Sequence, residues 1–303
     1  MTKNNDKKSS GSSETCSNED KNCTSTQAGP AKDPTNVPKD LPPKAKIDVK
    51  NVILVLSGKG GVGKSTVAVN LAAALSDSGK NVGILDLDIH GPNVPKMLGI
   101  ENQRPVVLAK SIQPVRISPT LAVMSMAFLL PDTSTPVVWR GPMKMGAIQQ
   151  FLSEVSWGSL DYLVVDLPPG TGDEALTIAQ LAPNVRGAVI VTSPQDVAVM
   201  DATKAIEFIK KLDLPVIGII ENMSGMLCPH CHEHVDIFGK GGGKKAAEQH
   251  DIPFLGEIPL DPAMVLAGDE GRPFIHVHSG SPTAQAMQDV MENLVKILEK
   301  NDS

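Results

Sequence analysis

A glycine-rich decapeptide at residues 57–66 constrains the fold of this chain more than any other stretch. It reads Ser-Gly-Lys-Gly-Gly-Val-Gly-Lys-Ser-Thr, with an apolar run at residues 52–56 before it and apolar residues at helical spacing after it. Glycines let the backbone turn so that its N–H groups point inward at phosphate oxygens, and the following helix adds its positive dipole end there. Strand, loop and helix in this order therefore predict a phosphate-binding loop in an α/β fold.

Two lysines of this loop are expected to have different tasks. Lys64 is placed to reach the β- and γ-phosphates of a nucleotide, and the neighbouring Ser65 hydroxyl is placed to hold Mg²⁺. Lys59 cannot easily point at the same phosphates from the side of Lys64, so it is either a solvated lysine or a charge delivered across a dimer interface. The residues expected to contact the nucleotide are Gly58, Lys59, Gly60, Gly61, Val62, Gly63, Lys64, Ser65 and Thr66.

Two further predicted strands end in carboxylates. The apolar run at residues 161–166 ends in Asp166 and continues as Leu-Pro-Pro-Gly-Thr-Gly, a pattern in which the aspartate holds Mg²⁺ through a water beside the phosphate loop. The strand at residues 81–86 leads into Asp88, which is predicted to orient the attacking water or to bind Mg²⁺ through water. Asx-turn chemistry is the structural alternative for Asp88. The catalytic candidates are Lys59, Lys64, Asp88 and Asp166.

Two later strand ends are candidates for the nucleoside. Asn222 ends the predicted strand at residues 216–222, and its amide carries the donor and acceptor needed to read an adenine edge. Turn chemistry at a strand end explains the same asparagine equally well. Pro259 ends the predicted strand at residues 254–259, and we expect it to pack on the nucleoside.

Cys228 and Cys231 form a Cys-x-x-Cys pair in a proline turn, within a predicted insertion at residues 223–238. Two thiolates complete neither a tetrahedral zinc site nor an iron–sulfur cluster, because both take four ligands. Three arrangements stay open: His232 or His234 completes a zinc site, a second copy of the chain supplies two more cysteines to a cluster, or the pair is a redox dithiol. The bridged cluster is favoured, because the extra loop lysine independently indicates a dimer.

Composition bounds the partners and the compartment. The formal charge of −6 gives no electrostatic reason to expect nucleic-acid binding. No apolar run approaches the roughly 18 residues of a membrane span, and the N-terminus lacks an apolar signal core. The charges on the predicted C-terminal helix are mixed, so stable membrane association is not expected. Four cysteines in a chain of 303 residues do not form a disulfide framework, and a reducing cytoplasm fits them best.

The first 46 residues differ from the rest. Residues 1–46 are rich in Ser, Asn, Lys, Asp and Pro, and they hold too few apolar side chains to offset the cost of ordering, so a disordered arm is predicted. Cys16 and Cys23 lie in this arm and are expected to be idle thiols. Residues 47–303 are predicted to form one α/β domain, a mostly parallel sheet flanked by helices.

In this order, the loop at residues 57–66, the Asp-x-Asp-x-x-Gly-Pro and Asp-x-Pro-Pro-Gly-x-Gly-Asp segments and the late Cys-x-x-Cys resemble the Mrp/ApbC family of P-loop iron–sulfur carrier proteins. The loop itself resembles the deviant Walker A motif of MinD/ParA-like (SIMIBI-like) ATPases. The resemblance implies a P-loop NTPase fold and a homodimer that binds and hydrolyses ATP. It also implies a labile 4Fe–4S cluster, held between two chains and passed to apo-proteins.

Carried over by matching position, the resemblance assigns a role to each motif. Lys64 and Ser65 contact phosphate and Mg²⁺, Lys59 reaches the partner's nucleotide, Asp88 belongs to switch I, Asp166 is the Walker B acid, and Cys228 and Cys231 ligate the cluster. Three alternatives compete with this assignment. A MinD/ParA-like positioning ATPase would need a basic amphipathic C-terminal helix, and it leaves the thiol pair without a task. The others are a zinc-bound nucleotide-dependent regulator and an electron donor like the nitrogenase iron protein.

Overall fold

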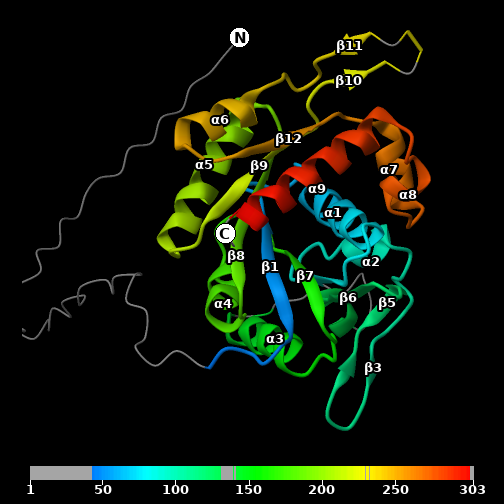
Figure 1. The fold of residues 1–303 in the computed structure, drawn as a ribbon, viewed down its shortest axis with the longest axis vertical. Coiled ribbons are helices and arrows are strands. Elements are labelled where there is room, and N and C mark those ends of the chain that lie inside the picture. Colours follow the sequence, from blue (N-terminus) through cyan, green and yellow to red (C-terminus); the bar gives the residue numbers. More distant parts are fainter. Residues whose placement is uncertain (1–42, 131–138, 140, 229, 232, 301–303) are drawn as a thin grey trace, which may run out of the picture. The chain divides into compact units, whose positions relative to one another are not determined.

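The structure is a computed structural model and describes residues 43–130, 139, 141–228, 230–231 and 233–300. Its central sheet comprises strands β1 (Val49–Leu56), β2 (Val82–Asp86), β5 (Val115–Ser118), β6 (Leu121–Ser125), β7 (Leu160–Asp166), β8 (Val185–Thr192), β9 (Val216–Asn222) and β12 (Phe254–Ile258). Within the described residues these eight strands have the order β12-β9-β8-β1-β7-β2-β6-β5 (Figure 1). All neighbours pair in parallel except β5 and β6.

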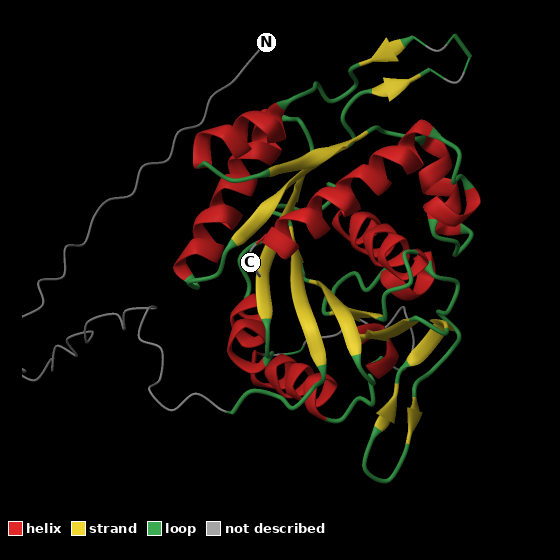
Figure 2. Cartoon of the chain, viewed as in Figure 1, coloured by secondary structure: helices red, strands yellow, loops and turns green. Residues whose placement is uncertain are grey.

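Helices cover both faces of this sheet (Figure 2). One group comprises α1 (Lys64–Asp77), α2 (Val94–Met97), α7 (Pro262–Asp269), α8 (Phe274–Val277) and α9 (Pro282–Lys300). The other comprises α3 (Gly141–Ser153), α4 (Asp173–Leu181), α5 (Asp196–Lys211) and α6 (Gly242–His250), and a 3₁₀ turn, Met126–Leu129, follows β6. The mostly parallel sheet flanked by helices on both faces confirms the predicted fold class.

The central strands lie between two helix layers, and their sequences show it. Residues 52–55 of β1 are fully buried, as expected for a parallel strand covered on both faces, where apolar residues run continuously instead of alternating. In α9, Met287, Leu294 and Leu298 are buried at helical spacing, as expected for a helix that packs one apolar face against the core. Among the described residues no helix combines the length and apolarity that crossing a membrane requires.

Two small hairpins stand apart from the central sheet. The first pairs β3 (Val106–Val107) with β4 (Ile112–Gln113). The second pairs β10 (Met226–Leu227) with β11 (His234–Val235) and carries Cys228 and Cys231. We call the second the thiol hairpin; it occupies the predicted insertion at 223–238. His232 lies outside the described residues, and so does the predicted arm up to residue 42, with Cys16 and Cys23.

The carboxyl ends of four neighbouring strands define the site. Register places Asp166 of β7 opposite both Val55 of β1 and Asp86 of β2, and it places Asp86 opposite Ser125 of β6. The loop at residues 57–66 leaves β1 at the same edge. Ligands of open α/β sheets bind outside the carboxyl ends of the strands, so the fold alone directs attention to this edge.

Candidate functional site

The phosphate-binding loop is shaped by glycines that face other backbone. A Cβ atom on Gly58 would lie 2.1 Å from the backbone of Asp201 in α5, so the start of the loop packs directly onto that helix. Gly61 and Gly63 have φ angles of 84° and 80°, which residues with a side chain rarely adopt. Among the described residues no side chain caps α1, so its first N–H groups are available to an anion.

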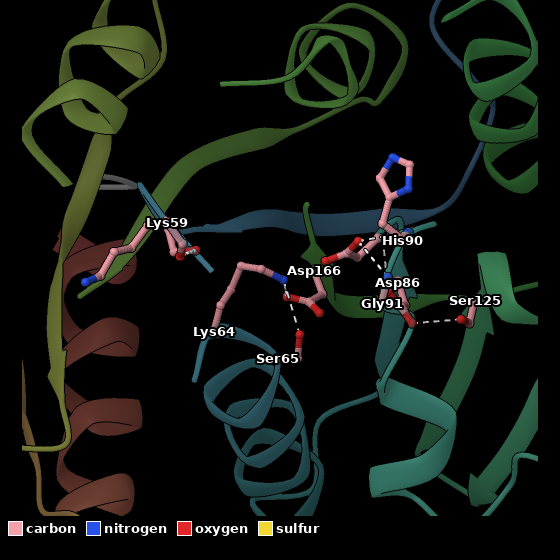
Figure 3. Close-up of polar contacts among 10 residues, drawn as sticks. Lys59, Lys64, Ser65, Asp86, His90, Gly91, Ser125 and Asp166 are labelled. Carbon is pink, nitrogen blue, oxygen red and sulfur yellow. Dashed lines mark hydrogen bonds and ion pairs between the residues drawn. The ribbon is translucent and has the colours of Figure 1, made fainter. Parts of the chain in front are cut away.

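Lys64 and Asp166 form a buried ion pair at the centre of the site (Figure 3). The Nζ atom of Lys64 lies 2.5 Å from Asp166 Oδ1 and also donates to Ser65 Oγ at 3.2 Å. Lys64 is 6% exposed and Asp166 is fully buried. Asp166 Oδ2 has no hydrogen-bond partner among the described residues. The predicted phosphate lysine, Mg²⁺ hydroxyl and Walker B acid thus meet at one point.

Asp86 adds a second buried carboxyl group beside Asp166. Its Oδ2 accepts from Ser125 Oγ at 2.7 Å, and its Oδ1 accepts from the N–H of Asp88 at 3.1 Å. Burial, and then the charge of Asp166, holds the pKa of Asp86 well above its usual range. Burial also raises the pKa of Asp166, and its ion pair with Lys64 opposes that rise. This acidic, dehydrated edge with one buried lysine suits a divalent cation.

Asp88 shows the turn chemistry that was its structural alternative. Its Oδ1 accepts from the N–H groups of His90 and Gly91, each at 3.2 Å, and the residue is 9% exposed. The carboxylate therefore holds the chain that leaves β2. Its part in orienting water or Mg²⁺ stays a prediction.

Lys59 points away from the ion pair (Figure 3). Its Nζ lies 3.5 Å from Gln195 Oε1, an exposed contact just before α5. The two loop lysines therefore do not serve the same side of the loop, as the sequence predicted. Two large apolar side chains on the neighbouring turn of α5, Val197 and Met200, are 63% and 64% exposed. Delivery of the Lys59 charge to a second chain stays a prediction.

Asn222 and Pro259 come together beside the phosphate loop. They line one small, largely apolar cavity with Thr66 and Met264. Asn222 is nearly fully buried, and its Nδ2 donates to the carbonyl oxygen of Val62 at 2.9 Å. The asparagine thus braces the loop from the sheet, while its contact with adenine stays a prediction.

The thiol hairpin presents its cysteines at the surface. Cys228 is half-buried and Cys231 is exposed. The backbone N–H groups of Cys231 and His230, and then the Cys231 thiol, lower the pKa of the Cys228 thiol. The hairpin closes through a hydrogen bond from the Cys228 N–H to the Glu233 carbonyl oxygen at 2.9 Å. Within the described residues no three metal-binding side chains cluster, so one described subunit offers two thiols and no complete site.

Comparisons with known proteins decide the family. A model described as ParA, NUBPL iron-transfer P-loop NTPase, matches residues 48–295. This chain belongs to that family. The iron-transfer P-loop NTPase assignment confirms the predicted resemblance to P-loop iron–sulfur carriers, and nucleotide hydrolysis is the general chemistry of such NTPases.

Relatives with curated names agree with the iron-transfer family. An iron–sulfur cluster carrier protein of Methanocaldococcus jannaschii is 58% identical over 227 residues, which cover 75% of this chain and 78% of the relative. A cytosolic Fe–S cluster assembly factor, the NUBP2 homolog of Trichoplax adhaerens, is 48% identical over 256 residues, 83% and 97% of the two chains.

Solved structures show how this iron-transfer NTPase compares in three dimensions. A nucleotide-binding protein of Archaeoglobus fulgidus in complex with ADP has a TM-score of 0.66 at 38% identity, covering 78% of this chain and 91% of that one. The cell division ATPase MinD of Pyrococcus furiosus has a TM-score of 0.61 at 24% identity, covering 82% and 99%. The likeness to MinD shows a shared fold alone.

The sequence analysis missed three side chains that contact or flank the site residues of this family member. Ser125 and Gln195 contact Asp86 and Lys59 from strands or loops far along the chain. Glu221 is fully buried one residue before Asn222. A charged residue directly after the uncharged run at 216–220, within the predicted strand at 216–222, was the available signal for Glu221, since a buried carboxylate needs partners.

Proposed function

We propose that this chain is an ATP-binding and ATP-hydrolysing carrier of a labile 4Fe–4S cluster, which two copies of the chain hold between them and deliver to apo-proteins. The observation that carries the proposal is the thiol hairpin, which presents Cys228 and Cys231 at the surface of a P-loop NTPase. The relatives named as iron–sulfur cluster carriers and as a cytosolic Fe–S assembly factor support it.

The nucleotide half of the proposal rests on the phosphate loop. Lys64 would bind the β- and γ-phosphates, and the free N–H groups at the start of α1 would take the phosphate oxygens. The residues present fit Mg²⁺. Asp166 Oδ2 is buried without a described partner, and the Ser65 hydroxyl and the Asp166 carboxylate both accept from the Lys64 ammonium group. Ser65 would hold the ion directly and Asp166 through a water, and the ion would neutralise phosphate charge.

The cluster half of the proposal rests on counting ligands. A 4Fe–4S cluster takes four thiolates, and the hairpin offers two, so two hairpins complete the set. Lys59, which faces away from its own phosphate site, supports the same arrangement, because a second copy would bring a nucleotide to it. With Cys228 half-buried and Cys231 exposed, the hairpin would hold a cluster where an acceptor protein can reach it. The word cytosolic in the name of the Trichoplax relative supports a cytoplasmic location.

Anaerobic reconstitution with iron and sulfide tests the proposal. We expect a brown protein with about four iron and four sulfide per pair of chains, a dimeric mass by light scattering, and transfer of the cluster to an apo-ferredoxin. The variants Cys228→Ser and Cys231→Ser should stay colourless while ATP hydrolysis continues. A matched surface change, Ser78→Ala, serves as the control. Colourless protein with stoichiometric zinc, or a monomer that keeps its full iron and sulfide, would overturn the proposal.

A further inference from the structure

Two consecutive residues at the end of β9 have different partners: Glu221 contacts the base of the thiol hairpin, and Asn222 contacts the phosphate loop. We infer that Glu221 is a positioning residue which fixes the thiol hairpin to the same strand end that Asn222 fixes to the phosphate loop. The pair thereby transmits the nucleotide state to Cys228 and Cys231. This inference rests on the proposed function, since it assigns a coupling role within that cycle.

Glu221 ties together both ends of the thiol hairpin. Its Oε1 accepts from Ser224 Oγ at 2.6 Å and from the N–H of Gly241 at 2.8 Å. Its Oε2 accepts from the N–H of Gly243 at 2.6 Å. Ser224 precedes the hairpin and the two glycines follow it, so one buried carboxylate closes the insertion at its base. Hydrogen bonds to a carboxylate are short and strong, so a shift of the end of β9 would also move the base of the hairpin.

Asn222 makes the matching contact on the other side of the strand. Successive side chains of a strand point to opposite faces, so the two neighbours separate at once. Asn222 Nδ2 donates to the Val62 carbonyl oxygen at 2.9 Å, and a Cβ on Gly63 would lie 2.2 Å from that Nδ2 atom. The phosphate loop therefore cannot shift at Val62 and Gly63 without moving or releasing Asn222. A parallel sheet is rigid here, because β9 lies between β8 and β12.

The hairpin base has a second attachment, which keeps the inference testable. The N–H of Ser224 donates to the Ile258 carbonyl oxygen at 3.0 Å, and the N–H of Leu260 donates to that of Gly225 at 2.8 Å. These bonds join the start of the hairpin to the end of β12 through backbone alone. Replacing the Glu221 side chain should therefore loosen the far end of the hairpin, at Gly241 and Gly243, without detaching the near end.

Thiol reactivity measures the coupling directly. The full-length protein, free of metal, is treated with iodoacetamide with and without a non-hydrolysable ATP analogue and Mg²⁺, and mass spectrometry follows the peptides of Cys228 and Cys231. In the wild type we expect the analogue to change the alkylation rate by at least about fivefold. Glu221→Ala should remove that change, and Glu221→Gln, which keeps one acceptor oxygen, should retain part of it. In both variants the affinity for the analogue should stay within about twofold, because the phosphate loop is untouched.

Two further variants guard against a trivial result. Glu292→Gln is the matched control, because Glu292 is half-exposed on α9, and it should behave as the wild type. If Glu221→Ala does not fold, Ser224→Ala removes one of the three donors and should reduce the nucleotide effect.

The inference is overturned if Glu221→Ala keeps the full nucleotide effect, or if it loses nucleotide affinity as much as coupling. It also falls alone if the wild type carries a cluster and hydrolyses ATP while its thiols react equally fast with and without the analogue. Failure of cluster reconstitution in the wild type would instead remove the proposed function.

Discussion

Lys64 Nζ and Asp166 Oδ1 lie 2.5 Å apart, with the lysine 6% exposed and the aspartate fully buried. The two charges neutralise each other, yet each is also the group that a nucleotide complex would need, the lysine for phosphate and the aspartate for Mg²⁺. Binding Mg²⁺ and ATP would therefore exchange this internal pair for two external ones. The ion pair is therefore the state of the site before nucleotide and Mg²⁺ bind.

Removing one partner of the ion pair should destabilise the protein more than replacing both partners. Lys64→Met leaves a buried carboxylate without its cation, so we expect about 3–5 kcal/mol of lost stability in nucleotide-free protein and loss of ATP hydrolysis by at least about 100-fold. The double variant Lys64→Met/Asp166→Asn should recover part of the stability and none of the activity. Urea unfolding and phosphate release measure the two effects. Strictly additive destabilisation would show that the pair does not couple.

Lys59 should affect activity and not folding. Its side chain is half-buried, and among the described residues its ammonium group hydrogen-bonds to Gln195 alone, so Lys59→Ala should change the free energy of unfolding by about 1 kcal/mol or less. If the lysine acts on a neighbouring chain, ATP hydrolysis should fall by at least about 100-fold. Mixing this variant with a Lys64→Met chain should restore activity, because each mixed dimer has one intact site. No recovery in the mixture would contradict action in trans.

Gly58 should resist the smallest substitution. An added methyl group would meet the backbone of Asp201 at 2.1 Å, so Gly58→Ala must push the loop away from α5. We expect a loss of about 1–3 kcal/mol in the free energy of unfolding. Gly146→Ala is the matched control, because its Cβ would meet no atom of the described residues within 4 Å and alanine favours a helix. Equal unfolding midpoints for both variants would show that the contact carries no constraint.

Asp86 should make stability fall as the pH rises. Its pKa in the folded protein lies well above the ordinary value of 3.8, so between those two values the native state binds a proton that the unfolded state has released. The contribution of Asp86 to the free energy of unfolding is then fully present below pH 3.8, and it is lost as the pH rises through the pKa of Asp86 in the folded protein. Asp86→Asn should abolish this part of the decline while keeping the contact with Ser125. Thermal melting from pH 4 to 8, with a chelator and without nucleotide, checks the slope, and parallel profiles would contradict the assignment.

The strand ends were predictable because local signals mark them. The apolar runs stop at Asp86 and Asp166, which indicates where these strands end. The glycine pattern of the phosphate loop indicates a strand, a loop and a helix in this order. The partners of these residues were not predictable, since they depend on strand order. Ser125 reaches Asp86 only because β6 lies beside β2, and Gln195 reaches Lys59 only because α5 packs on Gly58. The Asp88 turn was expected as a structural alternative, and its hydrogen bonds, which the sequence alone could not give, show that the turn forms.

The thiol hairpin begins and ends at a single carboxylate, Glu221. A segment whose two ends converge in this way can vary in length and composition without disturbing the strand that bears it. We therefore expect the whole segment, thiols included, to be replaceable by a different binding loop. Replacing the segment between Ser224 and Gly241 by another binding loop would give a redesigned carrier with an unchanged nucleotide-binding site.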